Sequence, residues 1–210
     1  MSVTTNSLPA STDGGAPTDR GGSAAQRDRR RRILDATYEL ASDGGFDAVQ
    51  MRAVAEKADV ALGTLYRYFP SKIHLLVSAL GRQFDEAAPR LAAKPVPGDT
   101  AADRVLYVLK RMARGMQGDP KLTEALTRAF MFADSSVSTE IHQVGMAMTS
   151  IVTHALHGED TSAETTEEEV AIARVLGDVW LSTLVAWVTG RSTAAETAAH
   201  METAVRLVLR

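Results

Sequence analysis

The chain has 210 residues, no cysteine and a formal net charge of −3 at pH 7. This length is sufficient for one or two compact units with a hydrophobic core. The absence of cysteine excludes disulfide bonds, thiolate zinc sites and cysteine nucleophiles. Alanine, leucine and valine are the commonest apolar residues, which favours an all-α fold.

Basic residues are concentrated near the start of the chain. Residues 27–74 hold nine Lys and Arg against seven Asp and Glu, a balance of +2, whereas residues 75–210 hold thirteen against seventeen, a balance of −4. A surface that binds nucleic acid therefore has to come from a local cluster of cations. The cations available for it are Arg27, Arg29, Arg30, Arg31, Arg32, Arg52, Lys57, Arg67 and Lys72.

The first elements are a tail and a helix. Residues 1–25 are predicted to be disordered, because their small and polar side chains bury too little apolar surface to offset the entropy of ordering. A helix is expected from Gln26 to the pair Gly44 and Gly45, since glycine adopts the left-handed conformation that ends helices. The arginine-rich run 27–32 is either a solvated helix end or a segment that contacts DNA phosphates, and the motif that follows favours phosphate contact.

Residues 51–72, MRAVAEKADVALGTLYRYFPSK, are typical of two short helices joined by a tight turn. Apolar residues recur at helical spacing in each helix: Met51, Val54, Ala55 and Ala58 in the first, and Leu62, Leu65 and Phe69 in the second. Pro70 should end the second helix and Ser71 should cap the next one. A short second helix that exposes polar and aromatic side chains suits the major groove of DNA.

The residues of this motif divide by expected role. Thr64, Arg67 and Tyr68 point away from the apolar face, so we expect them nearest the base edges. A second set is expected to fix the register through phosphate contacts: Gln50, Arg52, Tyr66 and Lys72.

The run ALGTLYRYFPSKIHLL resembles the signature of TetR-family transcriptional regulators, and RRRRILDATYELASDGGFDAVQMRAVAEKADV is similar to the first two helices of that family. LTEALTRAFMFAD and ARVLGDVWLSTLVAWVTGR are similar to a narrower group, the KstR-type repressors of sterol catabolism in actinobacteria. The resemblance implies about nine helices, with a DNA-binding domain at residues 26–86 and a ligand-binding and dimerisation domain at residues 87–210. It also implies a repressor released by a steroid acid or its coenzyme A thioester.

Helices are expected throughout the rest of the chain. A fourth helix should run to about Ala92, before the linker AAKPVPGD. Asp99 is expected to cap a fifth helix, and Asp119 a sixth that begins at Pro120. A seventh helix is expected at residues 136–157, followed by an acidic loop and two last helices.

Flexible and broad apolar side chains are frequent in this second half, and they suit an adjustable cavity for a lipid-like effector. The candidate lining residues are Met112, Met116, Phe130, Met146 and Trp180. Ordinary core packing is the alternative for each of them. No cofactor is expected apart from the effector.

Residues 180–188 are apolar nearly all round and need cover on more than one side. Pairing with the last helix in each of two chains would give a four-helix homodimer interface, and the alternative is an internal helix of a monomer. The candidate interface residues are Leu181, Leu184, Trp187, Val188 and Val205. The most apolar segment, residues 179–188, is shorter than the ~20 residues that span a bilayer, and the chain start lacks signal-peptide features, so a soluble cytoplasmic protein is expected.

Catalytic and metal-binding patterns are weak. Carboxylates are scattered along helices, so the chain is not expected to be an enzyme. His154 and His157 lie one turn apart, but we expect them to face solvent rather than to hold a metal. The favoured function is a dimeric DNA-binding repressor. The alternatives are an activator or dual regulator with the same DNA module, and a helical acyl-thioester-binding protein with no role on DNA.

Overall fold

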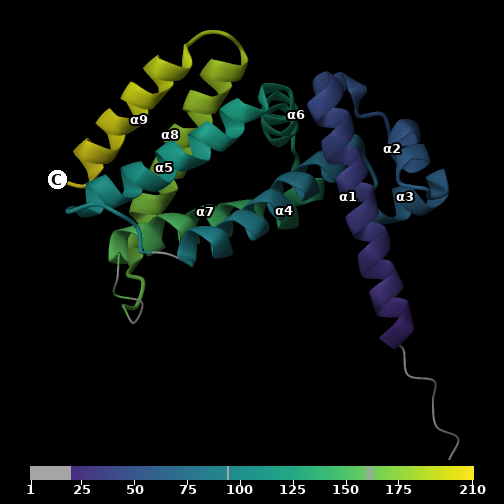
Figure 1. The fold of residues 1–210 in the computed structure, drawn as a ribbon, viewed down its shortest axis with the longest axis horizontal. Helices are drawn as coiled ribbons and strands as arrows, with labels where there is room; N and C mark the ends of the chain where they lie inside the picture. Colours follow the sequence, from purple (N-terminus) through teal and green to yellow (C-terminus); the bar gives the residue numbers. More distant parts are fainter. Residues whose placement is uncertain (1–19, 94, 159, 161–162) are drawn as a thin grey trace, which may run out of the picture.

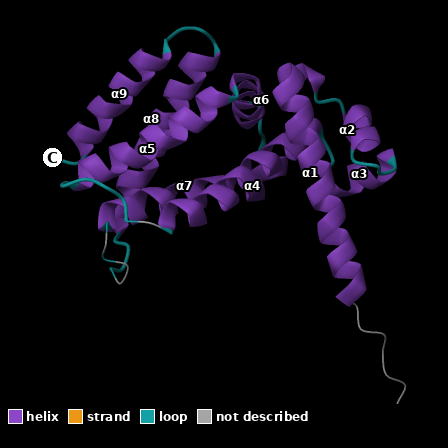
Figure 2. Cartoon of the chain, viewed as in Figure 1, coloured by secondary structure: helices purple, strands orange, loops and turns teal. Residues whose placement is uncertain are grey.

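In the computed structural model, the residues described are 20–93, 95–158, 160 and 163–210. Within them the chain forms nine α-helices, a short 3₁₀ helix and no strand (Figure 2), which confirms the predicted all-α fold. The helices are α1 (Arg20–Ala48), α2 (Met51–Lys57), α3 (Leu62–Tyr68), α4 (Lys72–Ala92), α5 (Ala101–Gly118), α6 (Pro120–Met131), α7 (Ser138–His157), α8 (Glu167–Val188) and α9 (Ala194–Val208), with the 3₁₀ helix at Ser135–Val137.

The helices form two groups (Figure 1). α1, α2 and α3 pack together at one end of the molecule, and α5, α8 and α9 pack together at the other. α4 and α7 run side by side between the two ends, and α6 packs against α1. Side chains no more than 1% exposed form the core at this end, among them Ile33, Leu34, Val54, Leu65 and Phe69.

Two boundaries near the first group differ from expectation. α1 begins at Arg20, so residues 20–25 are helical where a disordered tail was predicted, and the rest of that tail lies outside the described residues. At the other end Gly45 interrupts the helix with φ of 68°, as the glycine pair predicts. α4 is one continuous helix across the expected domain boundary at residue 86. The division of the chain into two domains at that point remains a prediction.

Side-chain caps fix where the later helices begin. Asp119 accepts a hydrogen bond from the backbone N–H of Leu122 and Pro120 is the first residue of α6, as predicted. α5 is capped by Thr100 rather than by Asp99, because the Thr100 hydroxyl accepts from the third backbone N–H of that helix. Each such cap satisfies a donor that the helix itself leaves unpaired.

α8 is longer and more apolar than the sequence segment 179–188 suggested. Its 22 residues have a mean hydropathy of 1.5 in the most apolar window, so by length and composition the helix is able to cross a membrane, and the segment 179–188 is only its last part. A core helix of a soluble protein passes the same test. Here, however, 22% of that window is buried within the chain, and Val175 is 47% exposed. α8 therefore presents apolar surface that a single chain leaves uncovered.

Candidate DNA interface and effector cavity

α3 is a short helix that the core holds by one face. Leu65 is fully buried and Phe69, directly after the helix, is 1% exposed, which holds α3 in the hydrophobic core. On the opposite side Tyr66 is 46% exposed, and Arg67 is exposed as well. α3 thus presents a phenol and a guanidinium to solvent, and both can donate hydrogen bonds to base edges or phosphates.

The exposure of Tyr66 and Tyr68 differs from what their expected roles require. Tyr68, assigned to the base edges, is half-buried and packs against the core. It follows Leu65 by three residues, so helical geometry puts both on the same face. Tyr66, assigned to the backbone, is the exposed tyrosine. Thr64 is half-buried, and the Arg67 guanidinium lies 6.0 Å from the centre of the Tyr68 ring.

Three arginines of the α1 run are occupied within the protein. Arg32 Nη1 donates a 2.7 Å hydrogen bond to the carbonyl of Ala58, at the end of α2. The Arg30 guanidinium lies 5.3 Å from the centre of the Phe69 ring. Arg31 pairs with carboxylates on either side of it along α1. Arg30 and Arg32 therefore attach α1 to the helix-turn-helix, whereas the ion pairs of Arg31 stay within α1.

Like Arg30 and Lys72, four further cations at this end form no ion pair with any described residue. Arg27, Arg52 and Arg67 are exposed, and Arg29 is half-buried. Gln50 precedes α2, and its exposed side chain makes no capping hydrogen bond, which leaves the amide available. We call the surface formed by Arg27, Arg29, Gln50, Arg52, Thr64, Tyr66 and Arg67 the basic surface.

The last part of α1 and the two residues after it, residues 42–50, which we call the α1–α2 turn, are fastened to α6. Ser42 Oγ donates a 2.5 Å hydrogen bond to the Asp119 carboxylate, and the backbone N–H of Phe46 donates to Glu124 Oε2 at 3.1 Å. The close approach requires Gly45, because a Cβ there would lie 3.2 Å from the same Glu124 oxygen and the backbone has positive φ.

The ring of Phe46 is contacted by two cations. Lys72 Nζ lies 3.9 Å from the ring centre and the Arg128 guanidinium lies 4.4 Å from it. Partial burial of the Lys72 ammonium lowers its pKa. We call Phe46, Lys72 and Arg128 the Phe46 cluster. It joins α4, α6 and the α1–α2 turn, so Lys72, expected to bind phosphate, has an aromatic partner inside the protein.

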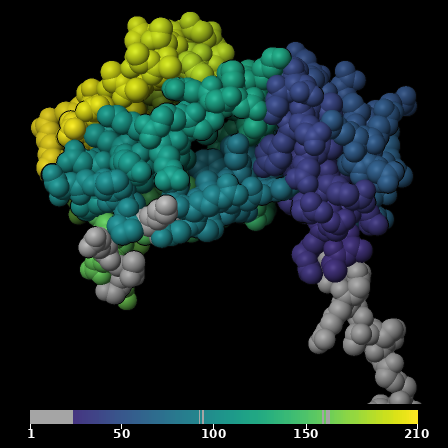
Figure 3. Space-filling view, in the orientation of Figure 1, coloured from purple at the N-terminus to yellow at the C-terminus, as the bar shows by residue number. Residues whose placement is uncertain are grey.

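A cavity of about 530 Å³ lies among α4, α6, α7 and α8, with Met116 contributed by α5. Figure 3 shows a hollow between α4 and α5 on one face of the molecule. Leu126 and Trp180 of its lining are buried, whereas Met146 and Val170 are exposed, so the cavity opens past α7 and α8. Its size and mainly apolar lining suit a small hydrophobic ligand.

The polar members of the cavity lining are Gln83, Thr123, Thr127, His142, Thr149, Arg174 and Asp178. Arg174 and Asp178 lie in the lining but are exposed, and neither forms an ion pair or hydrogen bond with a described residue. The indole Nε1 of Trp180 is buried and has no hydrogen-bond partner. The spacing of Val170, Arg174, Gly177 and Leu181 along α8 is a helical-face signal that would have predicted Arg174 from the sequence.

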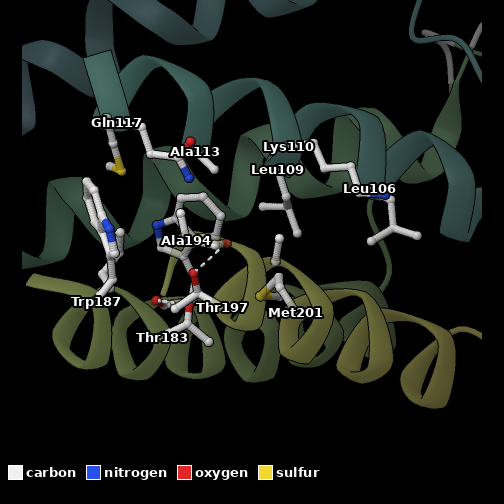
Figure 4. A pocket seen from close by; sticks show the side chains of 14 residues that line it. Leu106, Leu109, Lys110, Ala113, Gln117, Thr183, Trp187, Ala194, Thr197 and Met201 are labelled. Carbon is white, nitrogen blue, oxygen red and sulfur yellow. Dashed lines mark hydrogen bonds between the residues drawn. The ribbon is translucent and has the colours of Figure 1, made fainter. Parts of the chain in front are cut away.

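A second, smaller cavity of about 40 Å³ lies among α5, α8 and α9. Figure 4 shows side chains of α5, including Leu109, directed toward side chains of α8 and α9, including Thr197 and Met201. Met116, Trp180 and Leu184 line both cavities, so these three side chains separate them.

Four of the five predicted effector-binding residues line the larger cavity: Met116, Phe130, Met146 and Trp180. Met112 lines neither cavity, although its helical spacing from Met116 made it a candidate.

The predicted dimer-interface residues lie in three places: the core, the cavity linings and the end of α8. Val205 is fully buried in the core of its own chain, so it is not on a surface that a partner can contact. Leu181 and Leu184 line the larger cavity, and Trp187 lines the smaller one. Val188 is half-buried at the end of α8.

His154 and His157, both on α7, do not face solvent as expected. His154 Nε2 is buried without a hydrogen-bond partner. His157 Nε2 lies 3.0 Å from the Glu169 carboxylate, which joins α7 to the start of α8. In the described part of the chain, no group of three potential ligands is arranged to hold a metal.

Comparison with known proteins decides the family. Residues 33–79 match the family described as bacterial regulatory proteins, tetR family, and residues 98–208 match the tetracyclin repressor-like C-terminal domain. The HTH-type transcriptional repressor KstR of Rhodococcus jostii (strain RHA1) is 56% identical over 187 residues, which cover 89% of this chain and 85% of that protein. The chain belongs to the TetR family.

Solved structures agree with this membership. A TetR transcriptional regulator from Rhodococcus sp. RHA1 superposes with a TM-score of 0.78 at 34% identity, over 88% of this chain and 96% of that one. FadR of Thermus thermophilus, a TetR-family repressor solved in complex with lauroyl-CoA, has a TM-score of 0.63 at 20% identity, over 86% and 93% of the two chains. The second likeness supports the fold alone.

Membership of the TetR family accounts for the helix-turn-helix and for a C-terminal domain with a cavity. The attachment of α6 to the α1–α2 turn was not predicted, because Gly44 and Gly45 were interpreted as a helix end and Phe46 was given no role. The sequence feature that could have predicted this attachment is Phe46 itself. It is an aromatic residue directly after a glycine pair, and Lys72 and Arg128 are available to contact its ring.

Proposed function

We propose that the protein is a homodimeric transcriptional repressor that binds a palindromic operator and is released by a hydrophobic effector. One observation carries the proposal: helices that line the cavity also hold the DNA-binding end of the chain. α6 does so through Glu124 and Arg128. α7 does so through Glu140, whose carboxylate lies 3.0 Å from His74 Nε2 on α4. The His74 ring lies 5.9 Å from the ring of Phe69, at the end of α3.

Release would follow from a shift between two conformers. α4 contributes Leu80 and Phe84 to the cavity and begins immediately after the helix-turn-helix, while α6 and α7 contact it from the cavity side. An effector that prefers a conformer with differently spaced α3 helices must lower operator affinity, and the operator must lower effector affinity by the same factor.

The dimer would form through α8 and α9. Both helices carry exposed apolar side chains, among them Val175 on α8 and Leu207 on α9, and only 22% of the apolar window of α8 is buried within one chain. An isologous pairing of these faces would cover them without exposing an α8 helix to water. Two-fold symmetry then requires two half-sites about one turn of DNA apart, ~34 Å, or a multiple of it.

On DNA, the basic surface would make the contacts. We assign Thr64, Tyr66 and Arg67 to the base edges and Gln50 and Arg52 mainly to phosphates. In this assignment Tyr68 supports α3 and Lys72 supports α4 from within the protein, because both side chains are partly buried.

The effector is proposed to be a steroid acid or its coenzyme A thioester, and the controlled genes those of sterol or lipid catabolism. The resemblance to KstR-type repressors implies this class, and lauroyl-CoA is the ligand of the FadR structure that shares the fold. Arg174, exposed and unpaired within the described residues, lies in the cavity lining where an acidic group could bind it. As a bacterial gene regulator the protein would act in the cytoplasm, without a membrane.

The test is fluorescence anisotropy with the DNA upstream of the protein's own gene, at several salt concentrations, with and without a steroid acyl-thioester. A scrambled duplex of the same length is the control. We expect specific, salt-dependent binding that the thioester relieves. Specific binding that no thioester relieves would refute the effector class, and equal binding of both duplexes would refute the repressor.

A further inference from the structure

We infer that Gly63 is a specificity-determining residue of α3. Because it has no side chain, the helix can lie against a base pair whose thymine 5-methyl group fills the space beside the Gly63 α carbon. The inference rests on the proposed function, since it concerns a contact that α3 makes in the major groove. Gly63 has no side chain that forms hydrogen bonds, so it was not among the residues assigned to DNA. The contact requires a thymine in each half-site of the operator.

The first support is that nothing in the described chain requires a glycine here. Apart from its chain neighbours and the backbone of its own helix, a Cβ on Gly63 would meet no atom of a described residue within 4 Å. Glycine is a poor helix former, because it loses more conformational entropy on folding than alanine does. Gly63 is also not one of the described glycines with positive φ, which are Gly45, Gly98, Gly158 and Gly190. The reason for this glycine therefore lies outside the chain.

The second support is the place of Gly63 on the helix. The exposed residues of α3 are Gly63, Tyr66 and Arg67, and Leu65 is buried on the opposite side. Residues advance by 100° along a helix, so Tyr66 and Arg67 lie one turn after Gly63 and to either side of it. Gly63 thus lies at the centre of the face that would enter the groove. The N-terminal residues of a recognition helix contact base edges, so helix and bases come closest there.

The third support is the difference in size along this face. Tyr66 and Arg67 have long side chains, whereas residue 63 offers only its α carbon. A glycine allows the backbone to approach a ligand closely, so the first turn of α3 can come nearer to the bases than the second turn. The α carbon is apolar. The 5-methyl group of thymine is the apolar group that base edges present in the major groove, so it is the matching partner.

The experiment is a double-mutant cycle between protein and DNA, measured by fluorescence anisotropy with the upstream operator duplex. Wild type and Gly63→Ala are each titrated with the operator and with duplexes in which one symmetric pair of thymines is replaced by deoxyuridine, which lacks only the 5-methyl group. Gly115→Ala is the matched control. Gly115 is an exposed glycine of α5, at the other end of the molecule (Figure 1), and its Cβ would also meet no atom of a described residue within 4 Å.

We expect Gly63→Ala to bind the operator about 10- to 100-fold more weakly, as one mismatched base pair does, because the added methyl group occupies the space of the thymine methyl. Gly115→Ala should bind like wild type. At one thymine position, deoxyuridine should weaken wild-type binding by about fourfold for each methyl group lost. At that position it should weaken Gly63→Ala less, since the added methyl group then has room.

Three results overturn the inference and leave the proposed repressor standing. The first is equal operator affinity of Gly63→Ala and wild type. The second is an equal loss of affinity in Gly115→Ala. The third is an effect of deoxyuridine that is the same in wild type and Gly63→Ala at every thymine position. If wild type shows no preference for the operator over a scrambled duplex, the proposed function fails, and the inference fails with it.

Thermal melts separate this role from a structural one. Alanine is the better helix former and its Cβ has open space, so the midpoint of Gly63→Ala should match or exceed that of wild type. A lower midpoint together with weaker operator binding would assign Gly63 a structural role and overturn the inference. The deoxyuridine duplexes also test wild type without any variant. If none of them weakens its binding, no thymine methyl group is contacted and the inference is overturned.

Discussion

Replacing Phe46 by leucine would test whether α6 transmits effector binding to the DNA-binding end. Leucine keeps an apolar side chain and the backbone N–H that donates to Glu124, but it removes the aromatic face that Lys72 and Arg128 contact. A cation over an aromatic ring contributes ~0.5–1 kcal/mol at partly exposed sites, so the two contacts together amount to ~1–2 kcal/mol. The exposed ion pair of Arg128 with Asp47, at 3.8 Å, should add little.

If this attachment carries the coupling, Phe46→Leu should reduce the effector-induced loss of operator affinity by about five- to thirtyfold, the factor that ~1–2 kcal/mol represents. The assay is operator anisotropy with and without the steroid acyl-thioester. Phe132→Leu is the matched control, because Phe132 is 65% exposed just after α6 and has no ring contact among the described residues. An unchanged effector response in Phe46→Leu would refute the role of α6 and leave transmission to α4 and α7.

Three further outcomes are expected. Arg67→Ala should lose ~1–3 kcal/mol of preference for the operator over a scrambled duplex, measured by competition, if it contacts a base. Lys72→Ala should leave the slope of log affinity against log salt unchanged, and a slope reduced by ~0.9 would instead assign Lys72 to a phosphate. Hydrogen bonds from the Thr166 backbone and from His157 lower the pKa of Glu169 below its ordinary value of 4.5, so its stabilisation is present above that pH and lost as the pH falls through the folded-state pKa. Thermal melts of Glu169→Gln should therefore show a lower midpoint than wild type at pH 7, and this gap should close in acid.

Local signals predicted the helices well. The Asp119–Pro120 start of α6 and the interruption at Gly45 depend on backbone conformations that neighbouring residues determine. The buried faces of α2 and α3 follow from helical spacing alone, and Leu65 and Phe69 are buried as that spacing requires. Each of these features can be derived from a window of a few residues.

Side-chain roles were predicted less well, because they depend on partners distant in the sequence. Lys72 was assigned to DNA from its place in the TetR motif, yet Phe46 and Arg128, from α1 and α6, decide where its ammonium lies. Val205 was assigned to the dimer from its helical face, but periodicity does not tell whether an apolar face meets the same chain or another copy. It meets the same chain. The assignment of Met112 to the effector cavity is wrong for the same reason. Its spacing along α5 made it a candidate, but the cavity lies among other helices and Met112 does not line it.

α6 carries its two functions on opposite faces of one short helix. Leu126 and Phe130 line the cavity, while Glu124 and Arg128 hold the α1–α2 turn. Each pair is four residues apart, and the pairs are offset by two residues, which turns one about 200° from the other at 100° per residue. A helix of 12 residues is rigid on this scale, so displacement of its cavity face moves its other face too. A ligand that occupies the cavity without moving α6, α4 or α7 binds both conformers equally and leaves operator affinity unchanged, however tightly it binds. The potency of an effector in releasing the operator should therefore follow how far it displaces Phe130, rather than how tightly it binds the cavity.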